Sequence, residues 1–266
     1  MEALIDFSDP CLRTFLPVIL QDHTTGKNII WATDPPPELG VSFADEITLE
    51  QLDKVQLVPR VQKRLADQKK RTSKKAEVFT PTWVCKKMAD VAENDLKGED
   101  WKEYINKTCL EVTCGEAPFL TSRYDTTTGQ MIAVPDRIGL LDRKLNAITN
   151  EHFKDPKVWD YSLWLNYAMN AYISTYGYEW QGDNLLLARC NLFLTLMENF
   201  RSLFGNEIEN HRMSPVLIDA IADVISWNVW QMDGLKKTVP GTDIPCKTKN
   251  WKADKEILFK DVWEDD

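Results

Sequence analysis

The chain has 266 residues, of which 43% are apolar and 27% charged, and its formal net charge at neutral pH is −9. This composition is typical of a globular domain with a sizeable core and argues against a chain that is disordered throughout. No apolar run approaches the roughly 20 residues that a membrane span needs. The first residues lack the features of a signal peptide, and six scattered cysteines with three histidines disfavour a zinc site or a disulfide framework. We therefore expect a cytoplasmic protein with no membrane segment and no metal.

The charge is unevenly distributed along the chain. A net negative charge disfavours unaided binding to DNA, because phosphates attract clustered Lys and Arg. Residues 60–75, however, carry eight basic side chains and one acid. Such a run is typical of either a solvated helix face or a nucleic-acid contact, and both interpretations stay open. The candidate DNA-binding residues are Arg60, Lys63, Arg64, Lys69, Lys70, Arg71, Lys74 and Lys75.

The first third of the chain is predicted to contain one extended run and two helices. Residues 28–33 are β-like, and the three prolines at 35–37 end that run. A helix that becomes basic is predicted over 49–72. Another helix opens at Thr80 and Pro81, because Thr is a good N-cap and Pro suits the first helical position.

The rest of the chain alternates between short strands and longer helices. Strands are predicted at 110–113 and 175–180, and helices at 158–174, 183–204 and 217–225. This alternation favours an α/β fold with a mostly parallel sheet. Three candidate strands end in a glycine or an acid, at Glu111 to Gly115, at Glu179 and at Asp233. Ligands of such sheets bind at the carboxyl ends of the strands.

These strand ends suggest a nucleoside site. Gly115 allows a ligand to approach the backbone closely because it has no Cβ. The Glu179 carboxylate can accept both ribose hydroxyls, and Asp233 can accept from an adenine amino group. Each residue also has an ordinary alternative: a plain turn at Gly115 and at Asp233, and a helix cap at Glu179.

Four segments resemble motifs of one family. They are Phe79-Thr80-Pro81 with the following Trp83-Val84, the loop from Leu110 to Leu120, the segment from Tyr176 to Trp180 with Ala188 to Leu192, and the segment from Asn228 to Leu235. Together they resemble the adenine-N6 DNA methyltransferases, and most closely the modification subunits of type II restriction-modification systems. The resemblance covers roughly residues 28–260.

The resemblance implies a Rossmann-like fold that binds S-adenosylmethionine. It divides the chain into an N-terminal extension with a basic segment (1–75) and a methyltransferase-like cofactor domain (76–266). In the family, the first segment contacts the methionine part of the cofactor, the second forms the cofactor loop, the acid of the third binds the ribose and the Asp of the fourth holds the adenine. Trp180 is the residue we expect to pack against an adenine face. The implied cofactor-binding residues are Phe79, Thr80, Pro81, Glu111, Thr113, Cys114, Gly115, Glu116, Pro118, Glu179, Trp180 and Asp233.

The chain departs from the family at the catalytic step. Glu116 places a negative charge in a loop where the family has small residues. The N-P-P-Y or D-P-P-Y motif that should hold a flipped adenine does not follow Asp233. An Asp-Pro-Pro-Pro sequence at 34–37 precedes the cofactor loop instead, which makes Asp34 the candidate catalytic residue, although Pro37 stands where an aromatic ring should stack on the base. We therefore expect a subunit that acts on DNA together with a second polypeptide, which would supply the catalytic motif and target recognition.

Two other functions stay open. The chain could be a non-catalytic interaction protein that retains the methyltransferase fold, in phage defence or counter-defence, or a small-molecule methyltransferase that uses the Asp34 loop. A further cluster of charges, from Arg137 to Lys144, is compatible with a phosphate or partner contact and equally with a salt-bridged surface.

Overall fold

The computed structural model describes residues 3–75, 80–94, 99–155, 160–205 and 214–262, the side chains of Lys74 and Lys75 excepted. The helices are α1 (Pro10–Ile19), α2 (Leu49–Lys54), α3 (Leu65–Lys75), α4 (Thr82–Ala92), α5 (Trp101–Ile105), α6 (Leu140–His152), α7 (Tyr161–Ile173), α8 (Gly182–Phe204) and α9 (Pro215–Asn228). The strands are β1 (Gln21–Asp22), β2 (Lys27–Asn28), β3 (Cys109–Glu111), β4 (Thr175–Glu179), β5 (Val229–Gln231), β6 (Lys247–Asn250) and β7 (Lys255–Leu258).

A small parallel sheet organises the fold. Its strand order is β3-β4-β5, with Leu110 paired with Tyr176 and Tyr178 paired with Trp230. The expected mixed α/β class with a parallel sheet is therefore confirmed. Three short strands are not enough to identify a Rossmann-like fold, which was the finer expectation. None of the helices in the described ranges is long and apolar enough to cross a lipid bilayer.

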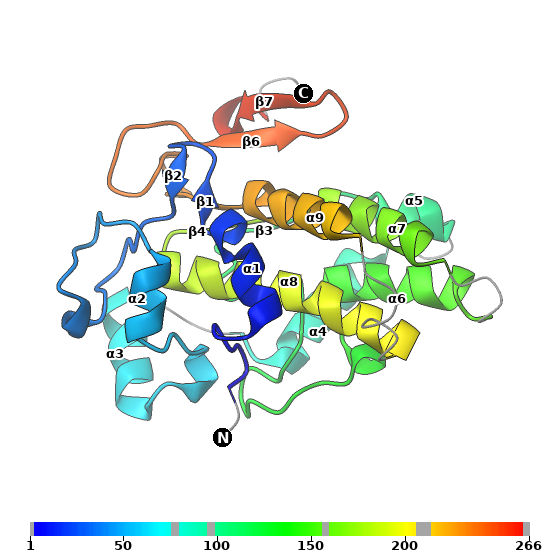
Figure 1. The fold of residues 1–266 in the computed structure, drawn as a ribbon, viewed down its shortest axis with the longest axis horizontal. Helices are drawn as coiled ribbons and strands as arrows, with labels where there is room; N and C mark the ends of the chain where they lie inside the picture. Colours follow the sequence, from blue (N-terminus) through cyan, green and yellow to red (C-terminus); the bar gives the residue numbers. More distant parts are fainter. Residues whose placement is uncertain (1–2, 76–79, 95–98, 156–159, 206–213, 263–266) are drawn as a thin grey trace.

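The two faces of the sheet are covered by different parts of the chain. Helix α8 packs against β4 and β5 on one face. On the other face, Tyr178 and Trp230 form a second core with Val239, Cys246 and Phe259, which come from the C-terminal segment that carries the β6–β7 hairpin. Figure 1 shows this hairpin, coloured orange to red, far from α8.

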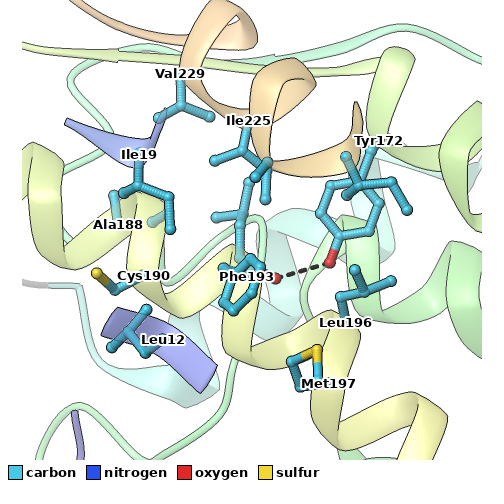
Figure 2. Close-up of a cluster of buried hydrophobic side chains, with 14 of the residues drawn as sticks. Leu12, Ile19, Tyr172, Ala188, Cys190, Phe193, Leu196, Met197, Ile225 and Val229 are labelled. Atoms are coloured by element: carbon cyan, nitrogen blue, oxygen red, sulfur yellow. Dashed lines mark hydrogen bonds between the residues drawn. The ribbon is translucent and has the colours of Figure 1, made fainter. Parts of the chain in front are cut away.

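Helix α8 is the centre of the main core. Eighteen of its residues are buried, because it lies among α1, α6, α9 and the sheet. Figure 2 shows Leu12 and Ile19 of α1 beside Cys190 and Phe193 of α8. The N-terminal extension thus shares one hydrophobic core with the helices that surround the sheet. The expected boundary between residues 75 and 76 stays a prediction.

Arg189 fixes several of these elements to one another. Its side chain is fully buried, and its guanidinium donates to the carbonyl oxygens of Ile19 (2.5 Å), Gln21 (2.8 Å), Ser226 (2.8 Å) and Val229 (2.6 Å). Burial lowers the pKa of Arg189 to about 10. One side chain therefore joins the end of α1, the end of α9 and the start of β5.

Several sequence-based expectations need correction. The extended run at 28–33 is a regular strand only at its first residue, because the residues after Asn28 hydrogen-bond to separate segments around residues 20 and 43–47. The helix predicted over 49–72 is interrupted between Lys54 and Leu65, where Pro59 lacks a backbone N–H and disfavours helix at the residue before it. The helix expected to open at Thr80 begins at Thr82, with Pro81 as its N-cap.

The later elements agree more closely with prediction. The strand predicted at 175–180 and the helix predicted at 183–204 correspond to β4 and α8. Helix α7 begins at Tyr161, where the Asp160 side chain accepts from the backbone N–H groups of Ser162 and Leu163. The start predicted for this helix, residue 158, lies outside the described residues. Helix α9 is longer than predicted at both ends, and β5 follows it directly.

Candidate functional site

The loop after β3 has an unusual backbone. Thr113, Gly115 and Ala117 all have positive φ angles, of 50°, 56° and 60°. A β-branched residue with positive φ is a genuine outlier, and left-handed conformations in non-glycine residues cost roughly 1–2 kcal/mol each. The loop is attached to the end of β4 by Cys114, whose N–H donates to the Tyr178 carbonyl (2.8 Å).

The structure brings the predicted glycine and the predicted ribose acid together. Glu179, the last residue of β4, accepts from the Gly115 N–H through Oε2 (2.8 Å) and from the Gln181 N–H through Oε1 (3.0 Å). The carboxylate is buried, and this burial raises its pKa. Both residues lie at the carboxyl edge of the parallel sheet, where β3 and β4 end side by side.

Glu111 is a second carboxylate at this edge. Its Oε2 accepts from the Leu120 N–H (3.2 Å), so the acid holds the two ends of the 112–119 loop together. Burial raises the pKa of Glu111 to about 8, and the nearby Glu179 adds to the rise. Two carboxyl groups with raised pKa values therefore flank the strained loop.

Thr80 and Pro81 lie beside a neighbouring turn. The Thr126 hydroxyl donates to the Thr80 carbonyl (2.9 Å), and the Thr126 N–H donates to the Thr82 hydroxyl (3.0 Å). Burial, and then the negative charge of Glu111, raise the pKa of the Cys85 thiol in helix α4 to about 12. Phe79, the third member of this predicted segment, lies outside the described residues.

The Glu116 carboxylate is held by the chain itself. Its Oε1 accepts from the Arg60 N–H (2.6 Å) and its Oε2 from the Tyr124 hydroxyl (2.9 Å), and the residue is only 3% exposed. The charge that looked unfavourable for a cofactor carboxylate is therefore paired with donors from the N-terminal extension and from the segment after the loop. Pro118, in the same loop, is half-buried.

Trp180 and Asp233 are also bound within the chain. The Trp180 indole N–H donates to the Ala32 carbonyl (2.9 Å), and its ring lies 6.4 Å from that of Phe43, centroid to centroid. Asp233 follows β5 by two residues, and its Oδ1 accepts from the N–H groups of Leu235 (3.0 Å) and Lys236 (3.1 Å). Asp233 thus stabilises its own turn, the ordinary alternative that its sequence allowed.

Asp34 lines a cavity of about 400 Å³ together with part of the basic run. Three of the candidate DNA-binding residues line this cavity: Lys63, Lys70 and Arg71. Arg71 donates to both carboxylate oxygens of Asp183 (2.7 and 3.1 Å), and the Lys63 ammonium lies 3.7 Å from the same carboxylate. The cavity therefore combines the Asp-Pro-Pro-Pro loop with a buried ion-pair cluster.

Gln181 connects this cavity to the sheet edge, and sequence reasoning missed it. Its side-chain oxygen accepts from Arg71 (2.8 Å) and contacts the Thr33 hydroxyl (3.2 Å), while its N–H donates to Glu179. The signal in the sequence was only its position, two residues after the acid that ends β4. One residue, Gln181, therefore links the two places: its side chain contacts Thr33 and Arg71, and its backbone N–H contacts the Glu179 carboxylate.

The remaining basic residues have different environments. Arg64 and Lys69 are exposed, and Arg60 is partly buried and donates to the Thr72 hydroxyl (2.8 Å). The side chains of Lys74 and Lys75 lie outside the described residues. Within the described ranges, no group of three or more His, Cys, Asp or Glu is arranged to hold a metal ion.

The charged cluster at 137–144 is buried at Arg137, Asp142 and Lys144. It reaches the surface at Arg143, which pairs with Asp90 and Glu93. Arg137 and Arg123 both pair with Glu198 of α8. Asp142 is buried and accepts from the Ser122 N–H (2.7 Å), and the Lys144 ammonium donates to the Ser174 hydroxyl (2.7 Å). These side chains fix α6 against α8 and the residue before β4. The cluster is salt-bridged, as one alternative held, but most of it is buried rather than exposed; the phosphate or partner contact stays a prediction.

Comparisons with protein-family models, with curated proteins and with solved structures found no match for this chain.

Proposed function

We propose that the chain is an S-adenosylmethionine-binding, DNA adenine-N6 methyltransferase-like subunit of a restriction-modification type system. One observation carries the proposal: Glu179 and the Gly115 amide lie 2.8 Å apart at the carboxyl edge of the parallel strands. In open α/β sheets this edge is where nucleotide-like ligands bind. A carboxylate has about four acceptor directions, so Glu179 retains acceptor capacity for ribose hydroxyls after its two contacts within the chain.

Two further features support a cofactor site at this edge. Strained backbone tends to cluster at ligand-binding loops, and the loop after β3 contains Thr113 and Ala117 in left-handed conformations. The strand order β5-β4-β3 also matches that of one half of a doubly wound nucleotide-binding sheet, in which the first strand is followed outward by the second and the third. A Rossmann-like fold for the cofactor domain is part of the proposal on this basis.

The methyl-transfer step is the incomplete part of this function. Asp34 is the chain's own candidate to accept a hydrogen bond from the adenine amino group, and its cavity is joined to Glu179 through Gln181. The cavity lacks an aromatic ring from the Asp-Pro-Pro-Pro loop to stack on a base. We therefore propose that a second polypeptide supplies the catalytic motif, and that exposed residues such as Arg64, Lys69 and Lys70 contact DNA phosphates.

A second function, a non-catalytic interaction protein that retains this fold, is favoured by a different observation. The carboxylates of Glu116 and Asp233, and the Trp180 indole, are all hydrogen-bonded to groups of the chain itself. Side chains that are satisfied in this way stabilise the structure without a ligand.

Calorimetric titration with S-adenosylmethionine separates the two functions. We expect micromolar binding to the wild-type protein and a loss of about tenfold or more in Glu179→Gln, because the amide can no longer accept two hydroxyls as an anion does. Glu256→Gln changes an exposed carboxylate on β7 and should bind like the wild type. Circular dichroism verifies that each variant is folded.

Two results would contradict the proposal. If a folded wild-type protein binds no S-adenosylmethionine, the interaction function takes its place. If the purified chain methylates adenine in DNA without any other protein, the second polypeptide is unnecessary, and loss of that activity in Asp34→Ala would identify Asp34 as the catalytic residue.

A further inference from the structure

A second, larger cavity lies at the opposite end of the sheet. It has a volume of about 690 Å³, well within the range of about 300–1,000 Å³ that is typical of small-molecule sites. Residues just before β3 and β4 line it, among them Thr108 and Ser174, so it opens at the amino ends of the strands. The β6–β7 hairpin, whose place in the fold Figure 1 shows, contributes Lys249 and Ile257 to the lining. It is therefore separate from the edge that holds Glu179.

Aromatic and aliphatic side chains form the walls of this cavity. Tyr176 and Trp230 come from the sheet, and Trp251, Ile257 and Phe259 from the C-terminal segment. The rings of Trp230 and Phe259 are 5.0 Å apart, centroid to centroid. The Trp251 ring is fixed by its indole N–H, which donates to the Asn228 side chain (2.7 Å). Rings held in this way offer flat apolar surface to a planar ligand.

The charge of the lining is opposite to that of the chain. Although the protein has a net charge of −9, two lysines and no acid are among the residues that line the cavity. Lys249 is 21% exposed, and its ammonium lies 4.5 Å from the Trp251 ring centroid and 2.9 Å from the carboxylate of Asp254. Lys252 is exposed. These two cations favour a ligand that carries a negative charge.

We propose that this cavity binds a small aromatic carboxylate, with its ring between Trp230, Trp251 and Phe259 and its carboxylate against Lys249 and Lys252. Asp254 competes with the ligand for Lys249. This site does not depend on the function proposed above, because it shares no residue with the Glu179 edge.

The probe for the test is 2-naphthoate, with the neutral alcohol 2-naphthalenemethanol as its matched comparison, both titrated into the full chain by calorimetry. We expect saturable binding of 2-naphthoate at submillimolar concentration and binding of the alcohol about fivefold weaker, the factor that one partly exposed ion pair provides. The double variant Lys249→Gln with Lys252→Gln should lower the affinity for 2-naphthoate to that for the alcohol. Lys255→Gln, on β7 but outside the lining, should leave both affinities unchanged.

Asp254→Asn should change the affinity for 2-naphthoate in the opposite direction from the double lysine variant. This substitution frees Lys249 from its ion pair, and Asn tolerates the positive φ of 47° at this position. We expect 2-naphthoate to bind about threefold more tightly, whereas a purely apolar site would not respond. Absence of saturable binding up to about 5 mM, a range that would include weak specific sites, overturns the proposal. Equal affinities in the wild type and the double lysine variant overturn it as well.

Discussion

His23 should make the stability of this protein depend on pH in the mildly acidic range. Its imidazole stacks on the Trp227 ring at 3.9 Å, centroid to centroid, and its Nε2 lies 2.7 Å from the Ser226 hydroxyl. That hydroxyl donates to the Asp223 carbonyl (2.8 Å), so Nε2 of the neutral ring donates to the hydroxyl oxygen. Burial, and then the positive charges of Arg189 and Lys249, lower the pKa of His23 to about 3.

The size of the effect follows from proton binding. The folded-state pKa of His23 lies below the unfolded-state value of about 6.5, so the unfolded chain takes up the proton first as the pH falls. Between pH 7.5 and pH 5 this difference lowers the free energy of unfolding by up to about 2 kcal/mol, since each pKa unit corresponds to about 1.36 kcal/mol. The side chain is 16% exposed, so we expect about 1.5 kcal/mol after solvent screening.

Urea unfolding at pH 7.5 and at pH 5 measures this change in the free energy of unfolding. The Asp223 carboxylate, 3.8 Å from Nε2, and the raised pKa values of Glu111 and Glu179 also contribute to the pH dependence of the wild type. We therefore compare the wild type with His23→Gln, in which these other groups remain. Between pH 7.5 and pH 5, the free energy of unfolding of the variant should fall by about 1.5 kcal/mol less than that of the wild type. For a urea dependence near 3 kcal/mol/M, this corresponds to a difference of about 0.5 M in the shift of the urea midpoint. Equal losses in the two proteins would show that His23 is not held neutral, and would refute the reasoning.

Two further predictions concern the packing around α8. Arg189→Met removes a buried cation that satisfies four carbonyl groups, and should lower the free energy of unfolding by about 3–5 kcal/mol. Arg201→Met, at an exposed position of the same helix, should change the free energy of unfolding by less than about 0.5 kcal/mol. Similar urea midpoints for the two variants would contradict the anchoring role of Arg189. In Gly182→Ala the new Cβ would lie 1.9 Å from the Ile30 carbonyl oxygen. The backbone must shift to relieve this clash, which should lower the free energy of unfolding, measured by heat or urea, by about 3 kcal/mol. A wild-type melting curve for this variant would mean that the extension does not pack against the start of α8 as the structure shows.

The fold class and the longest elements could be predicted from the sequence alone. The 3.6-residue spacing of apolar residues located α8, and the Thr175–Glu179 strand was recognisable because an apolar and aromatic run ended in an acid before a helix. The interruption at Pro59 was also encoded locally, but the helix-favouring residues on either side of it obscured that signal.

The contacts of the candidate site residues, in contrast, depend on how distant segments pack together. Whether Glu116 faces a ligand or the chain depends on where Arg60 and Tyr124 lie, and these residues belong to separate segments. The cluster at Arg137 looked like a surface because charged residues usually are exposed, yet Glu198, 61 residues later, supplies its partner inside the protein. A sequence pattern reports the preference of each segment for water or for the core. Pairing between distant charges is set by packing, and it is this pairing that separates a ligand-binding carboxylate from a structural one.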